Sequence, residues 1–588
     1  MYDNPKSIEK ITNNRLFDDK ERIDMYLKIV LSLVVFLTGI RHLNDVYQPT
    51  LLDDEYSYWS IAAYFNGRDW SSVTSLCKYY SYGYSFILYF LMKIFNNTVL
   101  MYRCAIVINA VFLTKSFLIL VKILKKIFSS ENINRITLVS FVSIMIPCYL
   151  SFVTVNLTEC LLLLLFLKTI YLLQEVGENT TSYDFFLISV VLGYSYMVHQ
   201  RMICVIIGVA VYFIILVIKK VVKIWQLLIP SVVLIMFFMA HHVMKEAIKV
   251  NLWLSGEMSS DNDYESIFEN IRFITGSIKQ MAVFIIGIMG KLFYFGSATY
   301  ILGFVAIVLI IIGTFRACRE YSEKTIYVIL SVSFVLMMIV SAVFMCRNEK
   351  LAWLVYGRYA EFLYPLIIAL GYFEIKSLIQ GSIKKYVILY LSGGGIYVVM
   401  GMIIRWYSKR RGLNWINYIS CNQIFKYTSG DNLPILKMMF IVGIIGSAVA
   451  ALLVVKKYRV ICEAVLLTSA IVMAFYTSEY SLNEVNLKLQ KSKYESSSCV
   501  EWIEENITPS GRVFFYISKD EENETAQYRE YLQYWMQNKR VICTDDENLY
   551  KISKGDIFVI SCEDYKDVAD AYGRCMYSNE FCHIYVWK

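Results

Sequence analysis

Long apolar runs recur along almost the whole chain, and they constrain its fold more than any other feature. A helix needs about 20 apolar residues to cross the hydrocarbon core of a bilayer. Membrane spans are expected near residues 25–43, 99–124, 135–152, 158–174, 184–201, 203–218, 225–243, 294–314, 324–345, 361–377, 386–404, 435–455 and 460–476. With 57% hydrophobic residues over 588 positions, the chain is predicted to be an α-helical polytopic membrane protein with about 13 transmembrane helices.

Lys and Arg gather at the ends of these runs and indicate which side each end faces. The clusters are Lys122, Lys125 and Lys126; Lys219, Lys220 and Lys223; Arg316 and Arg319; Lys384 and Lys385; and Lys456, Lys457 and Arg459. Cytoplasmic loops are enriched in Lys and Arg, so this is a positive-inside pattern and not a nucleic-acid footprint. The odd number of spans then places the C-terminus outside the plasma membrane. A cluster at Arg405, Lys409, Arg410 and Arg411 argues against this count.

Three regions follow from this topology. Residues 1–24 are expected to form a retained cytosolic tail, because they lack the apolar core and cleavage site of a signal peptide. Residues 25–476 form the transmembrane domain, with a first outer loop at 44–98. Within that loop the segment 82–95 is too short to span, and it is predicted to be an interfacial or re-entrant helix.

The last region, 477–588, is charged and is predicted to be a small C-terminal extracytoplasmic α/β domain. Candidate strands at 512–518, 539–544, 556–562 and 581–588 alternate with candidate helices at 494–506, 523–537 and 563–572. Most of the 14 cysteines are expected to be core residues, since no CxxC pair occurs. Five fall in this region, where one or two disulfides are expected if it lies outside: Cys499, Cys543, Cys562, Cys575 and Cys582.

Three consecutive acids, Asp53, Asp54 and Glu55, follow the first span in the stretch LLDDEYSYWSIAAYF. A carboxylate beside a membrane can have a raised pKa and accept a proton from an alcohol, or it can bind a divalent cation. One acid is enough to cap a helix, and Asp53 is the candidate for that role. Asp54 and Glu55 remain as candidate catalytic residues or ligands of a divalent cation.

The residues Asp54, Glu55, Tyr58 and Ala62, the Gly- and Tyr-rich segment YSYGYSFILYF and the helix start MYRCAIVINAVF together resemble a known family. The chain is similar to the GT-C superfamily of polyprenyl-phosphate-sugar-dependent glycosyltransferases. The similarity is greatest to its protein-mannosyltransferase and lipid A aminoarabinose-transferase branch, which includes glycosyltransferase family 39. Relatives have a proline-rich version of the second segment, and this chain departs from them there.

The resemblance implies roles for residues in the first loop. Asp54 matches the acid that serves as base or site organiser in relatives, and Glu55 stands beside it. Lys78, in CKYYSYGY, occupies the place of a basic residue that contacts the lipid phosphate. An interfacial lysine whose ammonium reaches toward water is an equally good interpretation of Lys78.

Three further motifs lie on the predicted outer side. Glu159 begins an apolar helix, where relatives carry an acid for sugar or cation, although the helix dipole alone also favours an acid there. Arg201, in the turn His199-Gln200-Arg201, is a better phosphate ligand than the histidine, since guanidinium pairs with phosphate in a bidentate way. Arg358 and Tyr359 precede a proline-bearing late helix, as in the superfamily; an aromatic belt with an interfacial arginine is the alternative.

Together these residues imply an integral membrane glycosyltransferase. Asp54, Glu55 and Glu159 would be catalytic, and Lys78, Arg201, Arg358 and Tyr359 would bind the donor. By the resemblance, the enzyme moves a monosaccharide from a polyprenyl phosphate to a hydroxyl of a protein, lipid or cell-wall polymer, with inversion at the anomeric carbon. A transporter or flippase of lipid-linked glycans is the alternative. Such a protein would carry charges near the midplane on broken helices, and no convincing pair of that kind occurs in the sequence.

Overall fold

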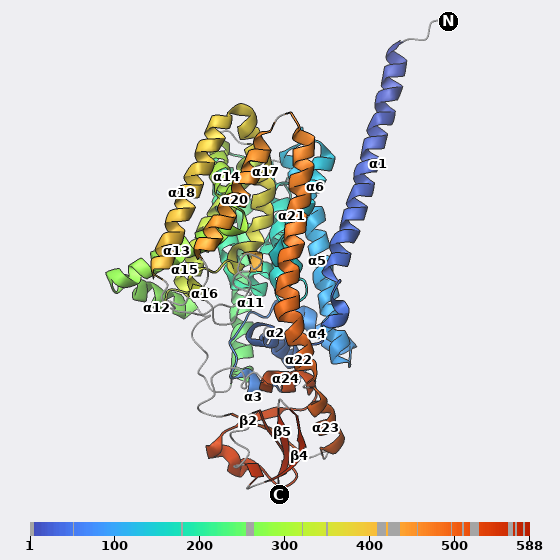
Figure 1. Cartoon of the computed structure of the whole chain (residues 1–588), viewed down its shortest axis with the longest axis vertical. Coiled ribbons are helices and arrows are strands. Elements are labelled where there is room, and N and C mark those ends of the chain that lie inside the picture. The colour runs from blue at the N-terminus through green and yellow to red at the C-terminus, as the bar shows by residue number, and fades with distance from the viewer. Residues whose placement is uncertain are drawn as a thin grey trace.

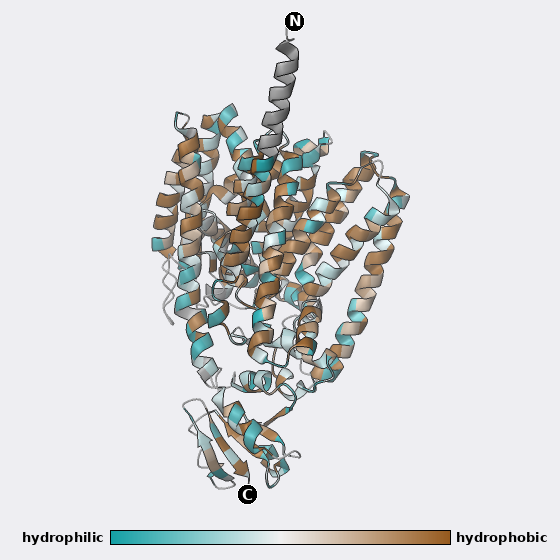
Figure 2. Ribbon diagram, turned by 90° about the vertical axis from the view of Figure 1, so that its right-hand side faces the viewer, coloured by the Kyte–Doolittle hydropathy of each residue, from teal (hydrophilic) through white to brown (hydrophobic). Residues whose placement is uncertain are grey.

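A long helical bundle with a small mixed sheet at one end makes up the protein (Figures 1 and 2). The computed structural model describes residues 5–50, 52–177, 180–253, 264–319, 322–347, 351–407, 419–421, 435–455, 457–495, 497–507, 511–517, 528–561, 569–570, 573–579 and 582–587. Within these residues, 11 helical segments are long and apolar enough to cross a membrane. The chain is a multi-pass membrane protein.

The bundle contains the following main helices: α1 (Pro5–Gly39), α5 (Thr98–Ile127), α6 (Ile133–Ile144), α7 (Pro147–Phe152), α8 (Glu159–Leu173), α9 (Ser182–Val198), α10 (Ile203–Ile218), α11 (Leu228–Leu252), α12 (Tyr264–Thr275), α13 (Ile278–Ala298), α14 (Leu302–Arg319), α15 (Tyr327–Phe344), α17 (Tyr364–Gly381), α18 (Ile383–Tyr407), α20 (Ile435–Val454) and α21 (Arg459–Ser481). Short 3-10 turns η2 (Gln200–Met202) and η6 (Arg358–Leu363) introduce α10 and α17. Hydrophobic residues run through the length of these helices (Figure 2).

Two of the predicted spans are interrupted. The span predicted at 135–152 is divided into α6 and α7 before Pro147, because proline lacks the backbone N–H that a continuing helix needs. The span predicted at 294–314 is wrong as a single helix: α13 begins already at Ile278, and Tyr300 and Ile301 with φ of 50° and 70° separate it from α14. With α8 and α9 at 15 and 17 residues, these differences explain 11 long helices against about 13 expected spans.

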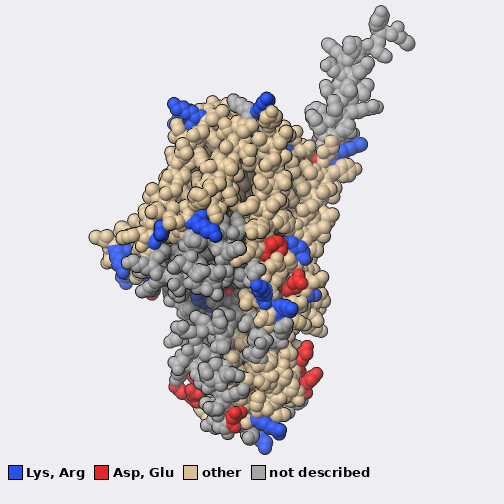
Figure 3. All heavy atoms as spheres, viewed as in Figure 1, with Lys and Arg blue, Asp and Glu red and all other residues tan. Residues whose placement is uncertain are grey.

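The basic clusters meet at the end of the bundle opposite the sheet. Lys219 Nζ donates to the carbonyl of Arg319 across 2.9 Å, and Lys376 Nζ lies 2.6 Å from a carboxylate oxygen of Glu131. Between the ends, Figure 3 shows a broad surface with few charged residues. Arg405 lies in the last turn of α18, and Lys409, Arg410 and Arg411 lie outside the described residues.

The first loop folds against the sheet end of the bundle. It contains α2 (Leu52–Phe65), α3 (Ser71–Thr74) and α4 (Ser85–Ile94), so the short segment predicted at 82–95 is helical. Asp53 lies in the first turn of α2, and its side chain is outside the described set.

The C-terminal region forms a five-stranded sheet in the order β2-β1-β3-β5-β4. Its elements are α22 (Leu487–Glu495), α23 (Ser498–Asn506), β1 (Val513–Tyr516), α24 (Tyr528–Trp535), β2 (Val541–Thr544), β3 (Ile557–Ile560), β4 (Gly573–Ser578) and β5 (His583–Trp587). Strands β1, β2 and β3 are parallel, whereas β5 is antiparallel to β3 and β4. The sequence did not predict β4, and α21 continues past the expected boundary at 477.

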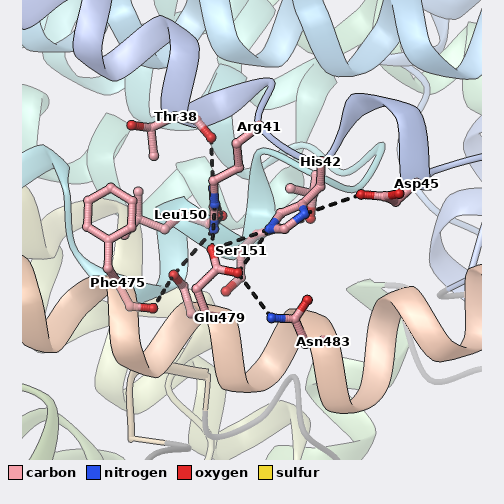
Figure 4. A network of polar contacts seen from close by, with 11 residues as sticks. Thr38, Arg41, His42, Asp45, Leu150, Ser151, Phe475, Glu479 and Asn483 are labelled. Atoms are coloured by element: carbon pink, nitrogen blue, oxygen red, sulfur yellow. Dashed lines mark hydrogen bonds and ion pairs between the residues drawn. The ribbon is translucent and has the colours of Figure 1, made fainter.

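A polar cluster ties the sheet end of α1 to α21 (Figure 4). The carboxylate of Glu479 lies 2.6 Å from Arg41 Nε and 3.0 Å from His42 Nε2. Arg41 also donates to the backbone carbonyls of Thr38 and Leu150, so α7 joins the same cluster. These contacts hold α1, α7 and α21 together where the bundle meets the sheet domain.

Candidate functional site

Asp54 and Glu55 are adjacent on α2, and a helix turns successive side chains about 100° apart. Their carboxylates therefore have different partners. Asp54 accepts from Nη1 of Arg358 and from the hydroxyl of Tyr80. Burial, together with the Asp54 carboxylate, raises the pKa of Tyr80 well above its usual range, so the phenol stays protonated and donates.

Glu55 is fully buried and points into the protein core. Its carboxylate accepts from the backbone N–H of Thr50 at 2.8 Å, from the backbone N–H of Asn156 at 2.7 Å and from the hydroxyl of Tyr102 at 2.7 Å. These bonds join the first loop to α5 and to the turn before α8. The geometry is that of a positioning group.

Arg358 lies between two carboxylates from distant parts of the chain. Its Nε donates to Oε1 of Glu159 across 2.7 Å, while Nη1 donates to Asp54. Arg358 is 8% exposed and Glu159 is 2% exposed. A buried ion pair needs close geometry of this kind to offset the cost of desolvation, and the planar guanidinium spans the two acids in a way that lysine cannot.

Arg201 is the second cation of the cluster and keeps unused hydrogen-bonding capacity. Its Nη2 lies 3.5 Å from Oε1 of Glu159, and its guanidinium lies over the ring of Tyr359, 5.5 Å from the centroid. Among the described residues, Nε and Nη1 of Arg201 and Oε2 of Glu159 are buried without a hydrogen-bond partner. Buried polar groups are normally satisfied, so these atoms are available to a polar ligand.

A pocket opens beside Arg201. Its polar wall contains His199, Gln200, Arg201 and Ser81, and tyrosines 79, 80 and 359 supply aromatic rings. Its apolar wall comes from Ile203, Ile267, Met337, Val340 and Phe344 of α10, α12 and α15. Burial and the two neighbouring arginines lower the pKa of His199, so its neutral ring accepts from the backbone N–H of Arg201. The pocket thus combines the charge of Arg201 with an apolar side.

The structure brings together Asp54, Glu159, Arg201, Arg358 and Tyr359, but it places Lys78 differently. Lys78 is half-buried in the segment before α4, and its carbonyl accepts from the hydroxyl of Ser57. In the described part of the chain its ammonium has no hydrogen-bond or ion-pair partner, and Lys78 does not line the pocket beside Arg201.

Glu361, near Arg358, was not among the predicted site residues. Glu361, three residues later on η6, is fully buried and accepts from the hydroxyls of Tyr294 and Ser420. The ring of Tyr294 also fills the space beside Gly357, where an added Cβ would lie 1.8 Å from its Cε1. The sequence signal that could have identified Glu361 is its position as an acid at the start of a membrane helix, because ionisable groups are costly in apolar surroundings.

The described side chains do not fit a divalent cation. Among them, no group of three or more His, Cys, Asp or Glu residues is placed to hold a metal ion. The guanidinium of Arg358 already lies between Asp54 and Glu159, and Glu55 is occupied by three donors.

No protein-family model and no curated protein sequence matches the chain. Solved structures do match it in fold. ArnT from Cupriavidus metallidurans bound to undecaprenyl phosphate matches with a TM-score of 0.52 at 11% identity, covering 95% of this chain and 97% of ArnT. The apo state of ArnT gives 0.51 at 12% identity with the same coverage.

An oligosaccharyltransferase from Archaeoglobus fulgidus, tethered with an acceptor peptide, gives a TM-score of 0.43 at 11% identity. That match covers 96% of this chain and 74% of the oligosaccharyltransferase. The agreement with ArnT extends over almost the full length of both chains, so this chain shares the fold of ArnT.

Proposed function

We propose that the protein is a membrane glycosyltransferase that moves a monosaccharide from a polyprenyl phosphate to an acceptor hydroxyl, with inversion at the anomeric carbon. The observation that carries this proposal is the cluster of Asp54, Glu159, Arg201 and Arg358, in which Arg201 keeps two buried and unpartnered N–H groups. A phosphate would satisfy these donors, because guanidinium matches phosphate oxygens in charge and geometry.

The walls of the pocket suit a lipid-linked phosphate. Its polar side holds Arg201, and its other side consists of apolar side chains from Ile203, Met337 and Val340. ArnT, whose fold this chain shares, has been solved with undecaprenyl phosphate bound. We place the donor phosphate at Arg201 with its lipid leaving along the apolar wall, and the sugar toward Asp54.

Asp54 is the proposed base. It takes the proton of the acceptor hydroxyl, whose oxygen forms a bond to the anomeric carbon as the bond from that carbon to the phosphate oxygen breaks. The polyprenyl phosphate leaves with both electrons of that bond. Arg201 and Arg358 stabilise its negative charge, and preorganised donors of this kind contribute about 2.7–4 kcal/mol each.

Binding of the phosphate would also change the contact between Arg358 and Asp54. A phosphate that draws the Arg358 guanidinium toward itself weakens this contact and frees Asp54 to accept a proton. Glu159 keeps Arg358 in place through its Nε, Tyr80 orients Asp54, and Glu55 positions α2 against α5. Lys78 does not line the pocket beside Arg201, so we assign it no contact with the phosphate.

The C-terminal domain is proposed to lie on the extracytoplasmic face. It covers the first loop: Trp535 Nε1 donates to Oε1 of Gln48, and Cys543 donates its backbone N–H to the hydroxyl of Ser72 across 2.9 Å. The basic clusters lie at the opposite end of the bundle, which a positive-inside orientation places in the cytosol. The acceptor would then reach Asp54 from outside the cell.

The test is transfer of radiolabelled sugar in membranes that contain the wild-type chain, using a panel of polyprenyl-phosphate sugars. We expect transfer from at least one donor and its loss in Asp54→Asn. Asp45→Asn removes a carboxylate that is 60% exposed and is not part of the cluster of Asp54, Glu159, Arg201 and Arg358. This variant is expected to retain wild-type activity.

Stereochemistry is read from the product by NMR, where inversion gives the opposite anomer to that of the donor. If Asp54→Asn transfers sugar as fast as Asp45→Asn, the proposed base is wrong. If the wild type transfers no sugar but moves lipid-linked glycan across reconstituted vesicles, the enzyme assignment is wrong and the transporter alternative holds.

A further inference from the structure

Two buried thiols face each other inside the C-terminal domain. Cys499 lies in the first turn of α23 and Cys582 lies immediately before β5, and each is 1% exposed. Their side chains are hydrogen-bonded to one another. Most of the sequence of the domain lies between them.

A third side chain locates both sulfurs independently. The hydroxyl of Tyr528, in α24, lies 3.4 Å from Sγ of Cys499 and also bonds to the thiol of Cys582. A hydroxyl that contacts both sulfurs places them in the same small volume of the core.

The backbone on each side is held in place without the thiols. Helix α23 packs on β4 through a 2.9 Å hydrogen bond between the hydroxyls of Ser498 and Tyr577 and through the rings of Trp502 and Tyr577. At the other side, the N–H of Cys582 donates to Oδ1 of Asn579 across 2.8 Å, in the turn between β4 and β5. The two sulfurs are thus presented to each other by elements that other contacts already fix.

We propose that Cys499 and Cys582 form a disulfide in the mature protein. The two thiols lose two protons and two electrons to the disulfide of a thiol oxidoreductase, which leaves as a dithiol while the Sγ–Sγ bond forms. Such bonds persist on the extracytoplasmic side of a membrane and are rare in the cytosol. The bond would attach the last strand of the chain to α23.

A third thiol in the same hairpin supplies the control. Cys575, on β4, is exposed, and its Sγ contacts the carbonyl of Tyr577. An exposed thiol reacts more readily with alkylating agents than a buried one. We therefore expect Cys499 and Cys582 to be paired and Cys575 to be a free thiol.

The experiment uses the full chain in cell membranes, quenched in acid, denatured and alkylated with N-ethylmaleimide without reductant, then digested and analysed by mass spectrometry. We expect a peptide pair that joins Cys499 to Cys582, with two hydrogens fewer than the sum of the peptides, and its disappearance after reduction. Cys575 should carry N-ethylmaleimide, as should the bundle residues Cys160 and Cys204.

Two variants sharpen the result. Cys575→Ser should leave the cross-linked peptide unchanged, and Cys499→Ser should expose Cys582 to N-ethylmaleimide. The wild-type measurement decides the question even if Cys499→Ser does not fold. Alkylation of both Cys499 and Cys582 before reduction overturns the proposal, and so does a cross-link of either one to Cys575. Glycosyl transfer plays no part in this readout.

Discussion

Nε of Arg358 donates to Oε1 of Glu159 across 2.7 Å, although the two residues are 199 positions apart in the chain. Glu159 begins α8, whereas Arg358 begins η6 ahead of α17. Neither motif contains an indication of the other. Their meeting converts two ambiguous interfacial charges into one buried cluster that Asp54 completes.

Replacing Arg358 by lysine should abolish most of the transfer activity. Lysine keeps the charge but cannot span Asp54 and Glu159 while also reaching a phosphate, and losing a preorganised donor costs about 10²–10³ in kcat. The initial rate of label transfer measures the effect. Arg347→Lys is the matched control, since that side chain is 51% exposed and pairs with Glu269 at the surface. An unchanged rate in Arg358→Lys would contradict the proposed role.

Arg201→Gln should raise the donor KM. Two buried nitrogens of the guanidinium have no hydrogen-bond partner among the described residues. A lost hydrogen bond to a charged group is worth about 1.5–3 kcal/mol, or roughly a tenfold to hundredfold weaker donor affinity. Donor titration in detergent micelles measures this change, with the exposed Arg272→Gln as control. A lower melting temperature with an unchanged KM would instead show that Arg201 only supports the fold.

Glu55→Gln should destabilise the protein more than it alters the chemistry. The neutral amide cannot accept all three hydrogen bonds from Thr50, Asn156 and Tyr102, and one buried donor left unsatisfied costs about 1–3 kcal/mol. Thermal unfolding of the purified protein should show the loss, while the pH profile of kcat keeps its shape. Glu504→Gln, at an exposed position of α23, is the control. A displaced pH profile would make Glu55 a proton-transfer group.

Gly357→Ala should impair the site by displacing the buried ring of Tyr294, which packs beside Gly357. The new Cβ would overlap the ring of Tyr294, and overpacking of this kind typically costs about 1–3 kcal/mol. Because Tyr294 also holds Glu361 and through it η6, donor KM should rise together with the loss of stability. Gly395→Ala has no neighbouring atom within 4 Å and should behave as the wild type. If Gly357→Ala and Gly395→Ala had the same donor KM and the same stability, the proposed role of Tyr294 in holding η6 would be ruled out.

Acidification should loosen the C-terminal sheet through Asp556. Burial opposes ionisation, but the bonds from Arg512 and from the backbone N–H of Ser553 are stronger and lower the pKa of Asp556. A lowered carboxyl pKa contributes stability that is present above the unfolded value near 4 and is lost as the pH falls through the folded value. The stability of the sheet domain should therefore decrease below about pH 4 in the wild type.

Asp556→Asn should lack this part of the pH dependence and be less stable at neutral pH. Limited proteolysis around β3, followed from pH 3 to pH 7, separates the two proteins. Asp545→Asn is the control, because that carboxylate accepts from its neighbour Asn548 and pairs with no arginine among the described residues. A parallel pH dependence in the wild type and Asp556→Asn would contradict the prediction.

The sequence by itself determined the membrane class, most helix positions and the ends at which charge accumulates. Apolar length and basic clustering report local free energies of transfer, so each segment carries its own signal. The short helix of the first loop and four of the five strands were also local patterns. The breaks after Ala298 and before Pro147 were harder to predict, since apolar runs continue across them.

Only the tertiary structure decided how the charged residues divide their work. Asp54 and Glu55 are consecutive on a helix, and successive helix residues are rotated by about 100°. Asp54 therefore contacts Arg358, whereas Glu55 contacts Tyr102. The cost of burying a charge depends on which partners reach it, and these partners lie 304 positions away for Asp54 and 47 positions away for Glu55. The sequence therefore determined which residue types are available at the membrane edge, and packing of the bundle decided which of them meet.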